Sequence, residues 1–361
     1  MNIVQHFACD YSDARTRFLA AARAAGAAVT PLQNPLRGPE TEKLFTDVAW
    51  YGPADAERVL VTLSATHGVE GFCGALCQTA WLAEGMNREL PRGVALMAIH
   101  AINPHGFAWI RRVTEDNVDL NRNFVDHTQP YPVNAAYEEL RDAIVPEDWS
   151  DAGRAAADAR LAAYAAKHGA MALQTAVTGG QYSDPLGLFF GGNAPTWSNR
   201  TLIAIFKRFL SRAKHVALID YHTGLGPYGH GELITGLLPD TANFNLTRDW
   251  LGNELTSPLL GNSASAKLFG INQVGMEAAI PRARFAAVAI EYGVAPMDET
   301  REALRADNWL HVYGDLRTAQ GRAIKAEMRR VFYGDTDQWK TMVWDRSVEI
   351  HHRLLKGLAE S

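Results

Sequence analysis

Apolar and polar positions are arranged along the chain in two kinds of segment. Short runs rich in Val, Ile, Leu and Ala are typical of buried strands, whereas longer apolar or amphipathic segments between them are typical of helices. Because the two kinds alternate, the pattern predicts an α/β sheet covered on both faces. We predict strands at 45–51, 58–64, 94–99, 215–221 and 284–291, helices at 12–27, 71–84 and 196–213, and a mostly helical region at 299–354.

One region departs from this alternation. Residues 135–172 are rich in Ala with charges at helical spacing, which predicts two surface helices. The Gly- and Pro-rich stretch 176–195 carries Tyr182 and Phe189, so we expect an ordered loop. No repeat or flexible linker interrupts the sequence. We therefore predict a single domain over 1–361, with a helical and loop segment at about 135–195.

Composition narrows the class of protein. The 361 residues are 47% hydrophobic and 21% charged, as in an ordinary globular protein. The formal charge of −5 comes from interspersed signs, and no basic stripe indicates a nucleic-acid partner. No uninterrupted apolar run reaches the roughly 18 residues that a membrane helix needs, so no membrane partner is expected.

The cysteines and the N-terminal segment indicate the cellular compartment of the protein. Three cysteines are too few for a disulfide scaffold, and their odd number fits a reducing compartment. The first residues lack the basic start of a signal peptide, and charged residues interrupt their apolar part. We predict a cytoplasmic protein, and the sequence leaves the oligomeric state open.

Polar residues gather at the ends of four predicted strands. In open α/β sheets this is the edge at which ligands bind. His67 and Glu70 lie in a Gly-flanked turn after 58–64, and an Arg-, Asn- and Asp-rich stretch at 111–124 follows the strand at 94–99. Asp220 and His222 end a third strand. A fourth strand ends at Glu291.

Each of these groups can be interpreted as functional or as an ordinary structural feature. An imidazole and a carboxylate from one turn can bind zinc, but a loop histidine beside a solvated glutamate is common. Arginine and asparagine can bind carboxylates and polarise carbonyls, but charged loops are usually only hydrated. A polar group at the end of an apolar strand is either paired for structural reasons or tuned for chemistry. The four groups together are more specific than any one of them.

In order, these motifs are HxxE, NPxG, an arginine, DLNRNF, a strand-end DxH and a strand-end glutamate. This order resembles the M14 zinc carboxypeptidase superfamily, and in particular its bacterial DUF2817 branch of M14-like metallopeptidases. The resemblance covers about 58–295, and VDLNRNF at 118–124 is its most specific part. It implies that the segment at about 135–195 is an insertion, which we expect to cover the rim of the functional pocket. It implies a zinc-carboxypeptidase-like, three-layer α/β/α fold with a mixed, mainly parallel, twisted sheet of about eight strands. The site is then expected at the carboxyl ends of the strands.

The resemblance also implies roles for particular residues. His67, Glu70 and His222 match the zinc ligands, with one Zn²⁺ per chain and one coordination position left open. Glu291 matches the general base and proton shuttle. Arg112 matches the arginine that polarises the scissile carbonyl, and its neighbour Arg111 is the alternative.

Further matches concern the substrate and the support of the metal. Asn121 and Arg122 match the pair that binds the terminal carboxylate of the substrate. Asp119 matches a carboxylate that orients His67. His105 stands where the family turn NPDG has an aspartate, and we interpret it as structural. The mobile tyrosine of the family has no clear match, with Tyr228 and Tyr292 as candidates by proximity.

These roles predict zinc-dependent, carboxypeptidase-like hydrolysis of an amide bond next to a free carboxylate, with a small peptide as substrate. Two alternatives remain. One is an N-acyl amino acid deacylase that resembles aspartoacylase and succinylglutamate desuccinylase. The other is a zinc-binding protein without catalysis, against which the presence of Glu291 argues because zinc binding does not need it.

Two other patterns are expected to be unrelated to function. The glycines of 224–229 match GxGxxG, but a dinucleotide fingerprint must open a helix and the residues that follow are typical of a strand. Cys73 and Cys77 lie one helical turn apart in an apolar segment, which favours core packing over metal binding.

Overall fold

The computed structural model describes residues 3–361 and contains one eight-stranded sheet. The strand order is β1-β2-β4-β3-β5-β8-β6-β7. The pairs β4–β3, β3–β5 and β5–β8 in the middle of the sheet are parallel, as is β6–β7 at one edge. The pairs β1–β2, β2–β4 and β6–β8 are antiparallel. The mixed sheet is therefore confirmed. The strands are β1 (Ala28–Arg37), β2 (Lys43–Tyr51), β3 (Arg58–Leu63), β4 (Val94–His100), β5 (His215–Tyr228), β6 (Gly231–Ile234), β7 (Leu255–Thr256) and β8 (Arg284–Gly293).

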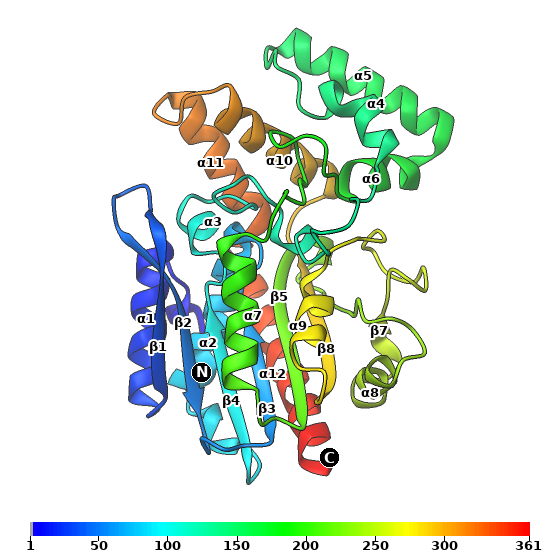
Figure 1. The fold of residues 1–361 in the computed structure, drawn as a ribbon. Helices are drawn as coiled ribbons and strands as arrows, with labels where there is room; N and C mark the ends of the chain where they lie inside the picture. Colours follow the sequence, from blue (N-terminus) through cyan, green and yellow to red (C-terminus); the bar gives the residue numbers. More distant parts are fainter. Residues whose placement is uncertain (1–2) are drawn as a thin grey trace.

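Helices cover both faces of the sheet, as expected (Figure 1). Side chains of successive strand residues alternate between two cores. Leu60 and Ile219 pack with α1, α2 and α12, whereas Val61 and Leu218 pack with α7 and α9. The helices are α1 (Tyr11–Ala24), α2 (Gly71–Ala83), α3 (Pro104–Ala108), α4 (Ala135–Ile144), α5 (Asp151–His168), α6 (Ala170–Thr178), α7 (Trp197–Phe209), α8 (Ala242–Leu251), α9 (Asn272–Ala279), α10 (Met297–Val312), α11 (Ala319–Phe332) and α12 (Asp337–Glu360).

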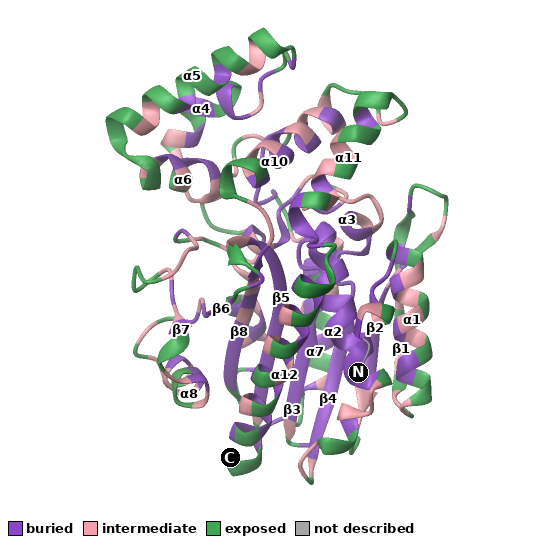
Figure 2. Ribbon diagram, turned by 180° about the vertical axis from the view of Figure 1, so that it is seen from behind, coloured by how far each residue is buried: buried purple, intermediate pink, exposed green. Residues whose placement is uncertain are grey.

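Burial distinguishes the strands from the helices around them. Figure 2 shows the central strands as buried along their length, while the covering helices are buried on one side only. All seven residues of β4 are buried. A sheet that is covered on both faces needs such uninterrupted apolar strands, which is why the sequence pattern identifies them well.

The strand β1 was not predicted, and β5 is longer than predicted. β1 contains Pro31 and Pro35, which argue against a strand in a sequence, but it lies at the edge of the sheet, where proline is tolerated. β5 continues beyond Tyr221 to Tyr228 and has an irregularity in its pairing with β8 after Thr223. The GxGxxG glycines therefore lie at the end of a strand, and β6 follows them instead of a helix.

The inserted segment forms three helices where the sequence predicted two. α5 ends at His168 and α6 begins at Ala170, because Gly169 between them has a φ of 94°, a left-handed value that breaks the helix. These helices lie beyond the carboxyl ends of the central strands (Figure 1). They share a hydrophobic cluster with α10 and α11 that includes Tyr137, Val177 and Leu304.

A helix that spans a bilayer must be both long and apolar. Within residues 3–361, every helix is too short or too polar to cross a bilayer. The longest, α12, has 24 residues and carries charges along its length.

Gly68 determines how closely the turn after β3 approaches α3. A Cβ atom at Gly68 would collide with the backbone of Gly106 and Phe107. We expect Gly68→Ala to lower the free energy of unfolding by about 1–3 kcal/mol, because backbone atoms must move to make room. The movement should also displace His67 and Glu70, which flank the glycine. Urea denaturation measures the first effect.

Gly38→Ala is the matched control. A Cβ at Gly38 would meet only the carboxyl end of the Glu42 side chain, which can rotate away. This variant should unfold at nearly the wild-type urea concentration. A Gly68→Ala protein that is as stable as Gly38→Ala would show that the approach of the turn to α3 is not tightly constrained.

Candidate metal centre and cavity

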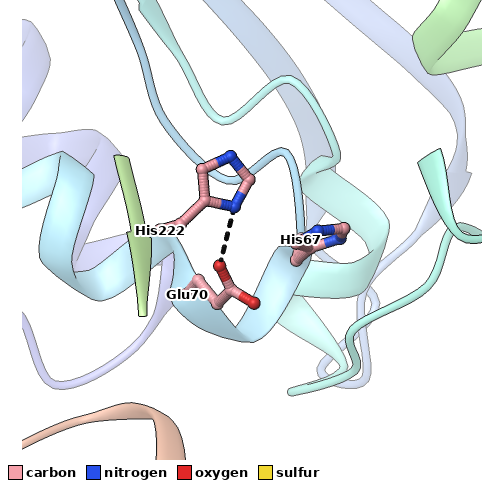
Figure 3. Close-up of side chains that lie close together, drawn as sticks. All are labelled: His67, Glu70 and His222. Atoms are coloured by element: carbon pink, nitrogen blue, oxygen red, sulfur yellow. Dashed lines mark hydrogen bonds and ion pairs between the residues drawn. The ribbon is translucent and has the colours of Figure 1, made fainter. Parts of the chain in front are cut away.

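Three buried side chains converge at the carboxyl edge of the sheet. His67 and Glu70 lie in the turn that follows β3, and His222 lies near the end of the regular pairing of β5. Figure 3 shows the two imidazoles and the carboxylate facing one another. One potential ligand atom from each residue lies within 4.8 Å of the others. The close approach follows from the parallel pairing of β3 with β5, which places the two strand ends side by side.

Glu70 is the central group of this site. Its Oε2 lies 3.1 Å from His222 Nδ1 and accepts a hydrogen bond of 3.1 Å from the backbone N–H of Thr223. Its Oε1 accepts a hydrogen bond of 3.0 Å from Arg112 Nη1. Both oxygens of this buried carboxylate are therefore bonded, and a positive group lies on each side of it.

His67 is held in its neutral form. Burial, and then the positive charge of Arg112, lower the pKa of His67 well below its usual value. Arg112 Nη2 lies 2.8 Å from Nε2 of the ring. Because a guanidinium only donates hydrogen bonds, Nε2 must be the accepting nitrogen and Nδ1 carries the proton. Nδ1 faces Asp119 Oδ1 at 3.5 Å.

His222 has the opposite environment. Burial alone lowers the pKa of His222, but the carboxylates of Asp220 and Glu70 outweigh burial and raise it well above the usual value. Asp220 Oδ2 lies 2.9 Å from His222 Nε2. Asp220 is itself fixed by hydrogen bonds from Thr66 Oγ1 at 2.9 Å and Asn272 Nδ2 at 2.6 Å. The ring is therefore oriented from both sides.

The donor set fits a metal ion. Two imidazoles and one carboxylate with space for a further ligand are the usual protein donors of catalytic zinc. Within residues 3–361, this is the one group of three or more such donors close enough to share an ion. Asp119 and Asp220 stand behind the two histidines, as carboxylates do in metal sites that orient their imidazole ligands. A cation here would also compensate the buried charge of Glu70.

The structure separates the two arginines that the sequence left as alternatives. Arg112 donates to Glu70 and to Asp119 Oδ2 at 3.0 Å, and it lines the cavity beside the histidines. Arg111 points away and donates to Asp307 Oδ2 at 3.2 Å and to Asn117 Oδ1 at 3.0 Å. Arg112 therefore lies at the cavity beside His67, and Arg111 does not.

Glu291 lies opposite the metal-binding group, on the neighbouring strand β8. It is paired in register with His222, and its Oε1 accepts a hydrogen bond of 3.1 Å from the backbone of Leu225. Burial, followed by the charge of Glu70, raises the pKa of Glu291 to about 8. A cation beside Glu70 would lower the pKa of Glu291 toward neutrality, where a carboxylate is an effective general base.

Asp119, Asn121 and Arg122 form a tight turn below the cavity. Asp119 Oδ1 accepts from the backbone of Asn121 at 2.9 Å, and Asn121 Oδ1 accepts from the backbone of Asn272 at 2.8 Å. Arg122 donates to the carbonyls of Asn121 at 3.0 Å and of Thr178 at 2.6 Å. Two nitrogens of the Arg122 guanidinium are thus engaged by backbone, although Asn121 and Arg122 both line the cavity.

The cavity has a volume of about 620 Å³ and extends from the metal-binding group to the inserted segment. Gln174, Thr178, Leu188 and Phe189 belong to that segment and line the cavity wall. The expected position of the insertion at the pocket rim agrees with this arrangement. The cavity also contains the predicted residues His67, Arg112, Asn121, Arg122, His222 and Glu291.

Sequence reasoning missed several residues and left others undecided. Asn272 and Thr66 hold Asp220, yet they are 206 positions apart and no local motif marks them. The two candidate tyrosines do not line the cavity: Tyr292 is buried against the backbone of Val343, and Tyr228 bonds Thr336. His105 stacks on Trp109 outside the cavity, which agrees with a structural role.

The fold and the site define a three-layer α/β protein with a buried His–Glu–His group, able to bind a metal ion, at the base of a cavity. The model of the DUF2817 family, which is described as a protein of unknown function, matches residues 7–346. The chain belongs to this family. No curated protein matches the sequence.

Several solved structures are similar to the chain. The product-bound ectoine utilization protein EutE (DoeB) from Ruegeria pomeroyi has 14% identity and a TM-score of 0.39, covering 84% of this chain and 66% of its own. An aspartoacylase family protein from Mesorhizobium loti has 15% identity and a TM-score of 0.37, covering 80% and 67%. The murein-tripeptide amidase MpaA from Escherichia coli O157 has 16% identity and a TM-score of 0.36, covering 81% and 94%. This chain thus spans slightly less than two thirds of the length of the ectoine utilization protein.

The position of Arg111 predicts a role in stability and not in metal binding. Arg111 and Lys325 both pair with the buried carboxylate of Asp307. Arg111→Gln should lower the free energy of unfolding by about 3 kcal/mol, because it breaks a buried ion pair. The zinc bound per chain, measured by plasma mass spectrometry, should stay at the wild-type value.

Arg112→Gln provides the contrast, since Arg112 contacts Glu70 and His67 directly. Its main effect should be on zinc retention and turnover. If Arg111→Gln instead loses zinc and keeps its stability, the two arginines have been assigned the wrong way round.

Proposed function

We propose that the protein is a zinc-dependent hydrolase that cleaves an amide bond next to a free carboxylate, in the manner of a carboxypeptidase. The observation that carries the proposal is the convergence of the His67–Glu70–His222 group with Glu291 and Arg112 in one cavity. Amide hydrolysis needs an activated water, a base and a group that stabilises the oxyanion, and these residues can supply each of them.

The roles follow from the positions of the side chains. When bound, zinc supplies Lewis acidity and lowers the pKa of a water molecule toward about 7. Glu291 would accept the proton of the attacking water on its carboxylate and pass it to the leaving amine. Arg112 donates to the oxygen of the scissile carbonyl as negative charge develops there. Asp119 keeps Arg112 in place through the 3.0 Å hydrogen bond to its Nε.

Asn121 and Arg122 are proposed as contacts for the substrate on the side away from Arg112. Both line the cavity, and the amide nitrogen of Asn121 has no partner within residues 3–361. Arg122 contributes positive charge, which favours a substrate that carries a carboxylate near the scissile bond.

The same residues would also serve an N-acyl amino acid deacylase, since the bond broken is of the same kind. The two functions differ in the size and polarity of the groups on either side of the amide. A panel of dipeptides and N-acyl amino acids, assayed with and without a chelator, separates them. Zinc binding without cleavage of any member would favour the non-catalytic alternative.

Metal content tests the proposed centre. Purified protein should hold about one zinc per chain by plasma mass spectrometry, because three donors converge in the folded state. His222→Ala should lose most of it, and chelation should abolish cleavage. If neither protein binds zinc even after it is added, every role proposed here is wrong.

Replacement of Glu291 tests the base. Glu291→Gln should keep its zinc while turnover falls by about 10³-fold, because the amide cannot accept the proton. Glu277→Gln is the matched control, since Glu277 lines the same cavity and its Oε1 accepts from Asn243 Nδ2 at 2.8 Å. Its effect on turnover should be far smaller. Equal losses in the two variants would remove Glu291 from the role of base.

A further inference from the structure

One part of the cavity wall is mainly apolar. It is formed by side chains from four regions: the inserted segment, the turn after β6, the segment between β7 and α9, and the start of α10. Representative members are Phe189, Leu238, Leu259, Phe269 and Met297. A pocket that bound only small acidic or polar molecules would need polar groups on this wall.

Several of these side chains are exposed. Leu238 is 64% exposed, Phe269 61% and Met297 43%. Single exposed apolar residues are common, but a group of them around one cavity marks a surface that a ligand covers. The exposed group continues into the cavity that contains Glu291 and Arg112, so the ligand that covers it also reaches the proposed reaction site.

The segment that carries part of this wall is held in place. Glu232 Oε1 accepts hydrogen bonds from Thr256 Oγ1 at 2.6 Å, Ser263 Oγ at 2.8 Å and the backbone of Ala264 at 3.2 Å. The carbonyl of Gly270 accepts from the backbone of Phe124 at 3.0 Å. These bonds flank Phe269, so its exposed position belongs to the fold.

One arginine of the cavity wall has its donors free. Arg112 is bonded to Glu70 and Asp119, and Arg122 is bonded to two backbone carbonyls. Arg301, on α10, also lines the cavity and is partly buried there. Within residues 3–361, no carboxylate forms an ion pair with Arg301 and no acceptor bonds it. A planar guanidinium with all its donors free is suited to bind a carboxylate with two hydrogen bonds.

We infer that the substrate is an amide that carries a large apolar group, packed against Leu238, Phe269 and Met297, and a carboxylate bound by Arg301. The inference rests on the proposed hydrolase function and defines its substrate class. Two sources share this chemistry: peptides of bulky apolar residues and long-chain N-acyl amino acids. Small N-acyl dicarboxylates lack the apolar group and are disfavoured.

The first experiment compares matched substrates on the zinc-loaded full chain. One arm pairs glycyl-glycine with leucyl-leucine, and the other pairs N-acetylglycine with N-decanoylglycine. The larger apolar member of at least one pair should have a kcat/KM at least about tenfold higher, since each added methylene in an apolar pocket favours binding. The arm that shows the larger ratio identifies the source. Preference for the small member in both arms would overturn the inference.

Phe269→Ala tests the apolar wall, with Leu260→Ala as the matched control. Leu260 is 56% exposed on the same segment but does not line the cavity. Phe269→Ala should reduce the large-to-small ratio of kcat/KM by about tenfold, mainly through KM, because a contact with the apolar group is lost. Leu260→Ala should keep the ratio. An unchanged ratio in Phe269→Ala would show that Phe269 does not contact the apolar group of the substrate, and would overturn this part of the inference.

Arg301→Gln tests the carboxylate contact, with Arg317→Gln as the control. The Arg317 side chain is 91% exposed and pairs only with Asp315 outside the cavity. The preference for the free acid over the C-terminal amide of the same substrate should fall by about tenfold in Arg301→Gln. The preference should persist in Arg317→Gln. If Arg122→Gln, and not Arg301→Gln, removes the preference, the carboxylate is bound by Arg122 and this part of the inference is wrong.

Binding measurements separate failure of the inference from failure of the proposed function. Titration calorimetry with zinc-loaded Glu291→Gln and uncleaved N-decanoylglycine or leucyl-leucine reports binding without turnover. Tighter binding of these compounds than of their small counterparts, with no cleavage by the wild-type protein, would support the substrate class and reject the hydrolase. Cleavage by the wild-type protein together with preference for the small members would support the hydrolase and reject the substrate class.

Discussion

The arrangement of the site depends on the burial of one carboxylate, that of Glu70. A charged group deep in a protein is stable only when hydrogen bonds and opposite charges surround it. Arg112, His222 and the backbone of Thr223 provide them. Each of these partners is fixed by a further group, so the charge of Glu70 organises the surroundings of both histidines. Any cation that binds here enters a site whose geometry is already determined by this balance of charge.

The sheet brings these partners together by register. Leu63 pairs with Asp220, and His222 pairs with Glu291, so the turn after β3 faces the last paired residues of β5 and β8. A slip of one residue in either pairing would turn a site residue to the opposite face of the sheet. The buried apolar runs of these strands therefore fix the positions of polar residues that contribute nothing to the core.

The sequence predicted the parts of the structure that depend on local pattern. The central strands are uninterrupted apolar runs, and the DUF2817 family was recognised from the order of several short motifs within about 58–295. β1 was missed because its prolines are tolerated only at a sheet edge, a position that tertiary structure decides. The pairing of Asp220 with Asn272 and the position of Arg301 in the cavity wall depend on the approach of distant segments, for which one sequence carries no signal.

The attachment of the inserted segment determines where the chain can accept an insertion. The carbonyl of Thr178, at the end of α6, accepts a hydrogen bond from the guanidinium of Arg122. The hydroxyl of Tyr182 donates a hydrogen bond to the backbone carbonyl of Arg122. The insertion is therefore fastened to the turn that carries Arg122, and its removal would open the cavity wall to water. The turn between α5 and α6, residues 166–171, is exposed. A label or an added domain is better accommodated there than at any boundary of the insertion.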